Sequence, residues 1–395
     1  MDVVVWLRGL GLRKYEAAFR ENEIDQSVHP SLTHETRDKG VMPRLSGATV
    51  HLPRWSRAFA DERKDHRFYE LTEDTLRDGF RYGYFVVENG ADVCAIQPYF
   101  ILDQDLLGGI NDVAKRCFDA VRRVWPRFMR AHTLMVGCSA GEGHLDTGEL
   151  SDVALAEALA RALPQLAREA GCVMIVLKEF PASYRAAMAC LGDAGFTRIP
   201  SMPMTKLALP FKRFDEYMRT KLSSGTRMKL RRKLRACASA HPPVTLEVTR
   251  DANGMVDDIY PLYLNVFARS PLQFEKLTKE FLAEIGARMP EKTRFLVWRQ
   301  EGRAVAFALC MMHGEDIYHE YVGFDYDVAF KLHLYYRVFH DIVEWAIANG
   351  YREFHSGSLN YDPKWHLRQS LDPIDLYVRH VLPPINAVFR RRLTA

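Results

Sequence analysis

One order of predicted elements occurs twice along this 395-residue chain. In each pass a strand–turn–strand unit and a further strand lead into alternating helices and strands. The first pass comprises strands at 84–88, 93–102, 133–138, 172–177 and 205–209, with helices at 110–124, 152–170 and 182–194. The second pass comprises helices at 259–268, 277–288, 332–348 and near Lys364, with strands at 295–299, 304–313, 316–324, 352–356 and 376–380. This order predicts an α/β (α+β) chain with two mixed sheets, each covered by helices on both faces.

The length also favours several domains, because 395 residues exceed what one small core usually accommodates. Residues 1–41 show helical spacing of apolar side chains, and residues 42–65 are polar, basic and proline-containing, as in a linker. We therefore predict an all-helical module with its linker at 1–55, a first mixed-sheet domain at 60–210 and a second at 211–395.

Composition and charge favour a cytoplasmic protein. The chain has no run of about 18 apolar residues and no basic region before its first apolar stretch, so neither a membrane-spanning helix nor a secretory signal is expected. The seven cysteines form no Cys-x-x-Cys pair, which is typical of reduced core thiols. The basic and apolar stretch 388–393 leaves open a frayed tail or peripheral contact with the inner membrane surface.

The start of the chain resembles a sterile alpha motif. The resemblance rests on Trp6-Leu7, Leu10-Gly11-Leu12, Tyr15 and Phe19, followed by Ile24-Asp25. The long last helix of that family has no counterpart after Val41, so the module is either incomplete or a plain helical extension. The resemblance implies self-association through this module.

The duplicated order resembles the GNAT acetyltransferase fold, and its doubling resembles Fem-type aminoacyl transferases and their bacterial GNAT relatives, over about residues 65–385. Two sequence features support the likeness: a basic stretch at 227–235 after Phe214-Asp215-Glu216-Tyr217, and a closing stretch with Phe354-His355-Ser356-Gly357 before Lys364. The resemblance implies an acyltransferase that uses acyl-CoA as a cosubstrate and holds no tightly bound cofactor.

The chain departs from the GNAT pattern at the phosphate-binding loop. GNAT enzymes usually carry Arg/Gln-x-x-Gly-x-Gly/Ala there, whereas this chain has Val322-Gly323-Phe324-Asp325 in its second half. The first half supplies Gly141 and Gly143 in a loop after a strand, which either forms a turn or holds phosphate. Arg231, Arg232 and Lys233 in the basic stretch either face solvent or contact a polyphosphate.

Candidate catalytic residues lie in the second half. Strict alternation along 317–322 places Tyr318, Glu320 and Val322 on one face and Ile317, His319 and Tyr321 on the other. A carboxylate in such an apolar strand is costly to bury, so Glu320 is the first candidate base and His319 the second, while a structural ion pair of Glu320 is the alternative. The resemblance adds Tyr361 as an acid, and Lys364 as a group that binds phosphate or the acyl carbonyl.

These observations favour an N-acyltransferase that acts on an amino acid, a cell-wall precursor or a long-chain amine. The alternatives are a Fem-type enzyme that uses aminoacyl-tRNA and a scaffold that only binds a ligand. Sequence-specific nucleic-acid recognition is not expected, because no aromatic residues interleave the basic stretch. No metal site is expected, because His333 and His340 share a helix face without a third acidic partner.

Overall fold

The computed structural model describes residues 41–46, 54–89, 92–105, 130–146, 148 and 150–393. The predicted helices within residues 1–40 and over 110–124 lie outside this part of the chain. Contacts divide the chain into two compact units, one of residues 1–60, 77–201 and 373–395 and one of residues 61–76 and 202–372. Neither unit is contiguous, because each also contains a segment from the other half of the chain, and the division between residues 201 and 202 lies near the predicted one at 210.

The first unit is built on a seven-stranded sheet ordered β1-β2-β3-β4-β5-β14-β6. Its strands are β1 (Val41–Ser46), β2 (Arg81–Asn89), β3 (Asp92–Asp105), β4 (Arg130–Val136), β5 (Met174–Pro181), β6 (Thr197–Pro200) and β14 (Ile374–His380). Only β4 and β5 pair in parallel, and the other neighbours are antiparallel. Helix α5 (Asp152–Glu169) is capped by Ser151, whose side chain accepts a hydrogen bond from the Ala154 amide. The helix buries Leu155, Leu159 and Leu163 in the core.

Short turns complete the first unit. They are η2 (Trp55–Arg57), η3 (Ala182–Arg185), η4 (Ala187–Ala189) and α6 (Cys190–Asp193). The helix predicted over 182–194 is helical in three short pieces rather than one: the 3-10 helices η3 and η4, and the α-helical turn α6 that directly follows η4. The C-terminal stretch forms helix α14 (Pro383–Leu393) rather than a frayed tail, and Asn386 anchors it by donating to the Gly195 carbonyl at 2.8 Å.

The second unit contains a sheet of the same design, ordered β13-β7-β12-β11-β10-β9-β8. Its strands are β7 (Met204–Ala208), β8 (Val244–Thr249), β9 (Thr293–Gln300), β10 (Arg303–His313), β11 (Asp316–Phe324), β12 (Glu353–Ser356) and β13 (Ser370–Asp372). Here β11 and β12 form the parallel pair. The prediction of two mixed α/β sheets in tandem is confirmed.

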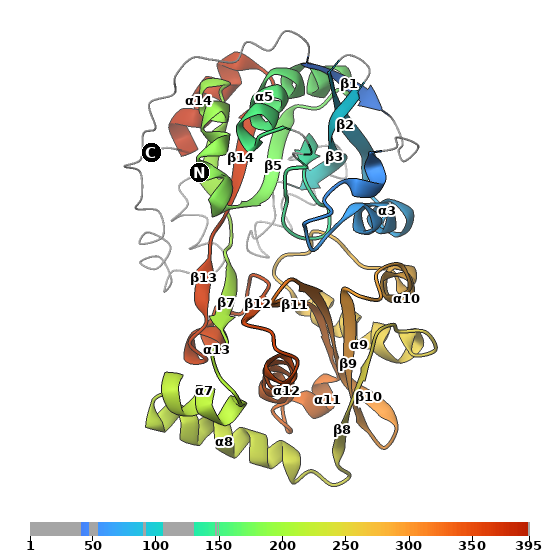
Figure 1. Ribbon diagram of the computed structural model, residues 1–395, viewed down its shortest axis with the longest axis vertical. Helices are drawn as coiled ribbons and strands as arrows, with labels where there is room; N and C mark the ends of the chain where they lie inside the picture. Colours follow the sequence, from blue (N-terminus) through green and yellow to red (C-terminus); the bar gives the residue numbers. More distant parts are fainter. Residues whose placement is uncertain are drawn as a thin grey trace, which may run out of the picture. The chain divides into compact units, whose positions relative to one another are not determined.

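Helices cover both faces of the second sheet (Figure 1). They are α3 (His66–Thr75), α7 (Phe214–Lys221), α8 (Ser224–Ala238), α9 (Val256–Arg269), α10 (Lys279–Arg288), α11 (Tyr326–Ala329), α12 (Leu334–Ala348) and α13 (Tyr361–His366). Helix α12 buries Leu334, Val338 and Ile342 in one core with residues of α7 and α8. On the other side α9 packs so closely that a Cβ on Gly323 of β11 would lie 2.6 Å from the Leu262 and Tyr263 backbone.

The two sheets exchange a strand. In each sheet the parallel pair is followed by one antiparallel strand: β14 beside β5 in the first sheet and β7 beside β12 in the second. The predicted order assigns β7 to the first sheet and β14 to the second. In the structure β7 belongs to the second sheet and β14 to the first. The predictions that 205–209 completes the first half and that 376–380 closes the second are therefore wrong.

The predicted linker at 42–65 is also wrong, because much of it is built into the fold. Residues 41–46 pair with β2. Trp55 is 2% exposed and its ring lies edge-on to Tyr84, 4.7 Å between centroids. Farther along, Arg63 and Lys64 are buried in the second unit. Over the residues that the structure describes, every helix is too short or too polar to span a bilayer.

Candidate functional site

The parallel strands β11 and β12 part at the middle of β11. They pair only from Asp316 opposite Glu353 to His319 opposite Ser356, although β11 continues to Phe324. On its other side β11 contains a bulge: Leu309 of β10 pairs with Tyr321 and Cys310 pairs with His319, which leaves Glu320 as an extra residue. Bulges bend a strand and re-aim its side chains. The bulge therefore coincides with the point of parting.

The bulge changes the faces on which the side chains lie. The Tyr321 hydroxyl donates to Glu275 at 3.0 Å, and its ring contacts Tyr263 of α9 and Phe281 of α10. Val322 packs against the core that contains α12. The predicted alternation, with Val322 beside Glu320 and Tyr321 beside His319, is wrong because it allowed for no extra residue.

Glu320 faces two buried cations. Arg63 Nε lies 2.8 Å from Glu320 Oε1, and Lys64 Nζ lies 3.6 Å from Oε2. The Arg63 guanidinium also lies over the Tyr318 ring, 3.7 Å from its centroid. This ion pair is the structural alternative that the sequence left open, and the role of Glu320 as a base stays a prediction. Both cations precede α3 in the segment taken as a linker, so no sequence signal pointed to them.

Lys364 and His319 both lie where the strands part. The Lys364 side chain is 8% exposed and its Nζ donates to the Gly357 carbonyl, directly after β12. Burial lowers the pKa of Lys364 to about 7. Burial and the nearby Lys364 charge lower the pKa of His319 to about 3, so this imidazole is neutral at pH 7. His319 Nε2 is buried and has no hydrogen-bond partner in the described part of the chain.

The neighbouring polar groups are fixed by hydrogen bonds. The Tyr361 hydroxyl donates to the Pro203 carbonyl at 2.8 Å, and its role as an acid stays a prediction. Behind Ser356, the Gln369 side-chain oxygen lies 2.8 Å from the Thr205 hydroxyl and 2.9 Å from the Ser356 hydroxyl. This buried network holds β12 against β7, and the sequence carried no signal for it.

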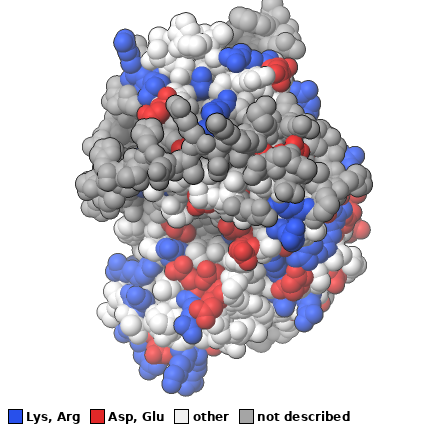
Figure 2. Space-filling model, turned by 45° about the horizontal axis from the view of Figure 1, so that its top comes forward, with Lys and Arg blue, Asp and Glu red and all other residues white. Residues whose placement is uncertain are grey.

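The basic residues of α8 lie near the start of α12. Lys233 Nζ stands 3.4 Å from the ring centroid of Tyr336 in the first turn of α12. Burial and the charges of Lys233 and Arg232 lower the pKa of His333, the residue that precedes α12. Arg231 instead pairs with Asp215 of α7 at 2.6 Å. Lys and Arg side chains gather at the lower end of the molecule in Figure 2, the end at which Figure 1 places α8.

The junction from β11 to α12 itself is acidic. The Asp325 side chain accepts from the Asp327 amide at 3.1 Å and pairs with Arg303. Positive charge near this junction therefore comes from α8, through Arg232 and Lys233. The start of α12 adds the backbone amides of a helix N-terminus.

The glycine loop of the first unit, with Gly141 and Gly143, packs against and hydrogen-bonds to strand β5. The Gly143 amide donates to the Glu179 carbonyl at 3.1 Å, and a Cβ on Gly143 would lie 2.7 Å from the Lys178 carbonyl oxygen. The Gly141 carbonyl accepts from Lys178 Nζ at 2.7 Å. In this conformation Gly143 cannot donate to a phosphate, so packing against β5 explains this glycine.

The two histidines predicted to share a helix face lie in different surroundings. His333 precedes α12, whereas His340 Nδ1 lies 2.7 Å from Asp341 Oδ1. Asp341 also accepts from Trp298 at 2.7 Å and from Arg337 at 2.6 Å. The Asp341 carboxylate is therefore part of a buried hydrogen-bond network that joins α12 to Trp298 of β9.

Comparison with known proteins gives one family match and several similar solved structures. Residues 224–364 match the acetyltransferase (GNAT) domain family, so the second unit carries a GNAT acetyltransferase domain. The structure of L-PGS from Bacillus licheniformis is 12% identical and covers 83% of this chain and 96% of that one, with a TM-score of 0.49. FemX is 11% identical (82% and 93% covered, TM-score 0.49), and a tandem GNAT protein from the clavulanic acid biosynthesis pathway is 10% identical (80% and 88% covered, TM-score 0.44). No curated protein sequence matches the chain.

The prediction of two GNAT-like mixed-sheet domains is confirmed for the described residues. The sterile-alpha-motif resemblance finds no support in these comparisons, because the matched domain begins at residue 224.

Proposed function

We propose that the second unit transfers an acyl group from a coenzyme A thioester to an amine, where β11 and β12 part. The observation that carries this proposal is the presence of a buried lysine and a neutral histidine at that point. Lys364 and His319 lie there within a domain that matches the GNAT acetyltransferase family. The described strand β11 is paired only with β10 beyond His319, which leaves its other edge for a ligand chain.

The two ends of the donor would use different groups. The polyphosphate of coenzyme A fits the start of α12, where Lys233 and Arg232 supply positive charge. The thioester carbonyl would then lie near Lys364. An N–H group of Lys364 can donate to the carbonyl oxygen as negative charge develops there.

The reaction requires a neutral amine as nucleophile. Its nitrogen forms a bond to the carbonyl carbon, the carbon–sulfur bond breaks, and the leaving sulfur takes the proton that the amine gives up. With a pKa of about 7, Lys364 can carry that proton between nitrogen and sulfur near neutral pH. His319 stays uncharged and can accept a hydrogen bond from the amine.

Acceptors of three kinds fit the proposal: an amino acid, a cell-wall precursor and a long-chain amine. A second function, aminoacyl transfer from tRNA, is favoured by the exposed charges of Arg231 and Arg232 on α8. Both functions would use the site where β11 and β12 cease to pair, and they differ only in the donor that binds there.

The test is to measure the unfolding temperature with acyl-CoA of several chain lengths and with aminoacyl-tRNA, and to assay thiol release with the three acceptors. A ligand that binds only the native state raises the unfolding temperature with concentration. We expect acyl-CoA to do so and thiol release to require Lys364. A shift with aminoacyl-tRNA alone would establish the second function, and no shift with either donor would leave a ligand-binding scaffold.

A further inference from the structure

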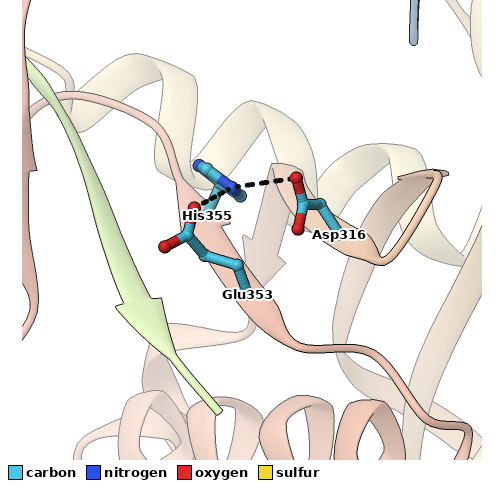
Figure 3. A group of neighbouring side chains, drawn as sticks. All are labelled: Asp316, Glu353 and His355. Atoms are coloured by element: carbon cyan, nitrogen blue, oxygen red, sulfur yellow. Dashed lines mark ion pairs between the residues drawn. The ribbon is translucent and has the colours of Figure 1, made fainter. Parts of the chain in front are cut away.

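A second cluster lies at the closed end of the β11–β12 pair. Asp316 begins β11, and Glu353 and His355 lie on β12. His355 Nε2 is 3.2 Å from Glu353 Oε2 and 3.8 Å from Asp316 Oδ2, so the ring edge faces both carboxylates (Figure 3). One ligand atom from each residue lies within 4.8 Å of the other two.

The imidazole of His355 is buried without a hydrogen bond. The residue is 5% exposed, and neither ring nitrogen has a hydrogen-bond partner among the residues described. The ring stacks on Tyr318 with 4.3 Å between centroids and 12° between planes, which fixes the direction of both nitrogens. Leaving a buried polar group without a hydrogen bond is unfavourable. A ring held in this way, with Nε2 3.2 Å from Glu353 and 3.8 Å from Asp316, is placed to share a ligand with these carboxylates.

We propose that Asp316, Glu353 and His355 bind a divalent transition-metal ion, with Zn²⁺ as the first choice. One imidazole nitrogen and two carboxylate oxygens form a ligand set that suits Zn²⁺, whereas Mg²⁺ and Ca²⁺ prefer oxygen alone. Tetrahedral ligands about 2.0–2.1 Å from zinc lie about 3.3 Å apart. The Glu353–His355 spacing of 3.2 Å already matches that value, and the Asp316–His355 spacing of 3.8 Å is about 0.5 Å longer.

Charge around the cluster favours a dication. A third carboxylate, Asp372 of β13, lies 3.6 Å from His355 Nδ1, on the far side of the ring. Lys206 of β7 lies 3.8 Å from Glu353 and 3.6 Å from Asp372. Three carboxylates and one ammonium leave two negative charges, which a dication neutralises. Asp372 stands where a carboxylate orients a metal-bound histidine by accepting from its other nitrogen.

The position of the cluster indicates a structural clamp. Asp316 and Glu353 are opposite one another in the register, three residues before the strands part at His319 and Ser356. Alternation along β12 places His355 on the face opposite Phe354 and Ser356. The ion would therefore tie the closed end of the strand pair, away from the side chains proposed for acyl transfer.

The test is calorimetric titration of the full chain, freed of metal by a chelator, with ZnCl₂, with CoCl₂ absorption as a second readout. We expect one Zn²⁺ per chain, a rise in unfolding temperature, and a visible cobalt band of tetrahedral type. His355→Gln and Asp316→Asn should weaken binding at least about 100-fold, since changes to outer partners alone cost about 10- to 100-fold. Asp372→Asn should fall within that smaller range.

The matched control is Glu315→Gln, which removes an exposed carboxylate next to Asp316 that pairs with Arg352 at 3.1 Å. It should bind Zn²⁺ as the parent does. Circular dichroism checks that each variant is folded, and Asp316→Asn serves if His355→Gln is not. Equal Zn²⁺ affinity in all folded variants, or no binding to the parent at millimolar metal, would overturn the proposal and leave a cluster held by a protonated His355. Neither result bears on acyl transfer.

Discussion

Arg63 Nε lies 2.8 Å from Glu320 Oε1, and this contact joins the segment before α3 to the bulge of β11. The Arg63 side chain is 5% exposed and that of Glu320 is 11% exposed, so solvent screens the pair little. We propose that this ion pair keeps the bulge in place. We therefore expect Glu320 to act through structure rather than as the base.

Replacing Glu320 by Gln tests that expectation. Arg63 and Lys64 would lose their shared carboxylate, and breaking a buried ion pair costs about 3–5 kcal/mol. We expect the free energy of unfolding to fall by about 3 kcal/mol, while the single-turnover rate per folded molecule stays unchanged. Denaturant unfolding and a single-turnover assay measure the two effects.

The control for this variant is Glu247→Gln, which removes an exposed carboxylate paired with Arg299 at 3.0 Å. Exposed pairs contribute about 0–1 kcal/mol, so this change should barely alter unfolding. If Glu320→Gln instead kept its stability and lost about 10²- to 10⁴-fold in rate, Glu320 would be the general base after all.

Lys364 gives the proposed reaction a pH dependence. Its pKa is about 7, so the neutral form grows as pH rises from 6 to 8. If the neutral amine accepts the proton, the single-turnover rate should rise through that range and level off above it. Lys364→Met should lose about 10²- to 10⁴-fold and lose this inflection. A rate profile in Lys364→Met parallel to that of the parent would remove Lys364 from proton transfer.

The same lysine links stability to pH. Because its pKa is about 7 in the folded protein and near 10.5 when unfolded, the unfolded chain binds more protons between these values. Stability contributed by this group therefore rises with pH from about 7 toward 10. Lys364→Met should remove that rise, and Lys331→Met, a change at an exposed lysine, should preserve it.

Arg232 and Lys233 should affect donor binding rather than chemistry. Each charge-assisted contact to a phosphate is worth about 1.5–3 kcal/mol, or about 10- to 100-fold in affinity. We expect Arg232→Ala and Lys233→Ala to weaken acyl-CoA binding by that factor and to leave the rate at saturating donor nearly unchanged. Lys229→Ala, on the same helix and exposed, is the control. Equal affinity in all three variants would place the polyphosphate elsewhere.

Local patterns predicted the elements, but not the way in which distant segments combine. The apolar periodicity of 152–170 and 332–348 located α5 and α12 closely, because one face of each helix is buried. Alternation located β7 and β14 but could not choose their sheets, since either sheet offers the same antiparallel neighbour. The bulge at Glu320 depends on pairing with β10, which a single strand does not reveal.

The candidate site residues could likewise be named from local sequence, but their partners from distant segments could not. Lys364 and His319 were named from resemblance and position, and the structure places both near the point where β11 and β12 part. The partners of Glu320 come from a segment without periodicity, so only the folded structure shows them. The carboxylates around His355 lie on three strands, β11, β12 and β13, whose order in the sheet decides that they meet.

The last prediction separates residues 41–55 from the residues before them. Removing residues 1–55 deletes β1, Arg54 with its ion pair to Asp146, and buried Trp55. Truncating a buried Trp costs about 3–5 kcal/mol. A chain that lacks residues 1–55 should therefore unfold at a clearly lower temperature than one that lacks only residues 1–40. Light scattering on the two truncated chains and the parent then assigns any change in association to residues 1–40. Equal unfolding temperatures for the two truncated chains would show that β1 and Trp55 add no stability to the first unit.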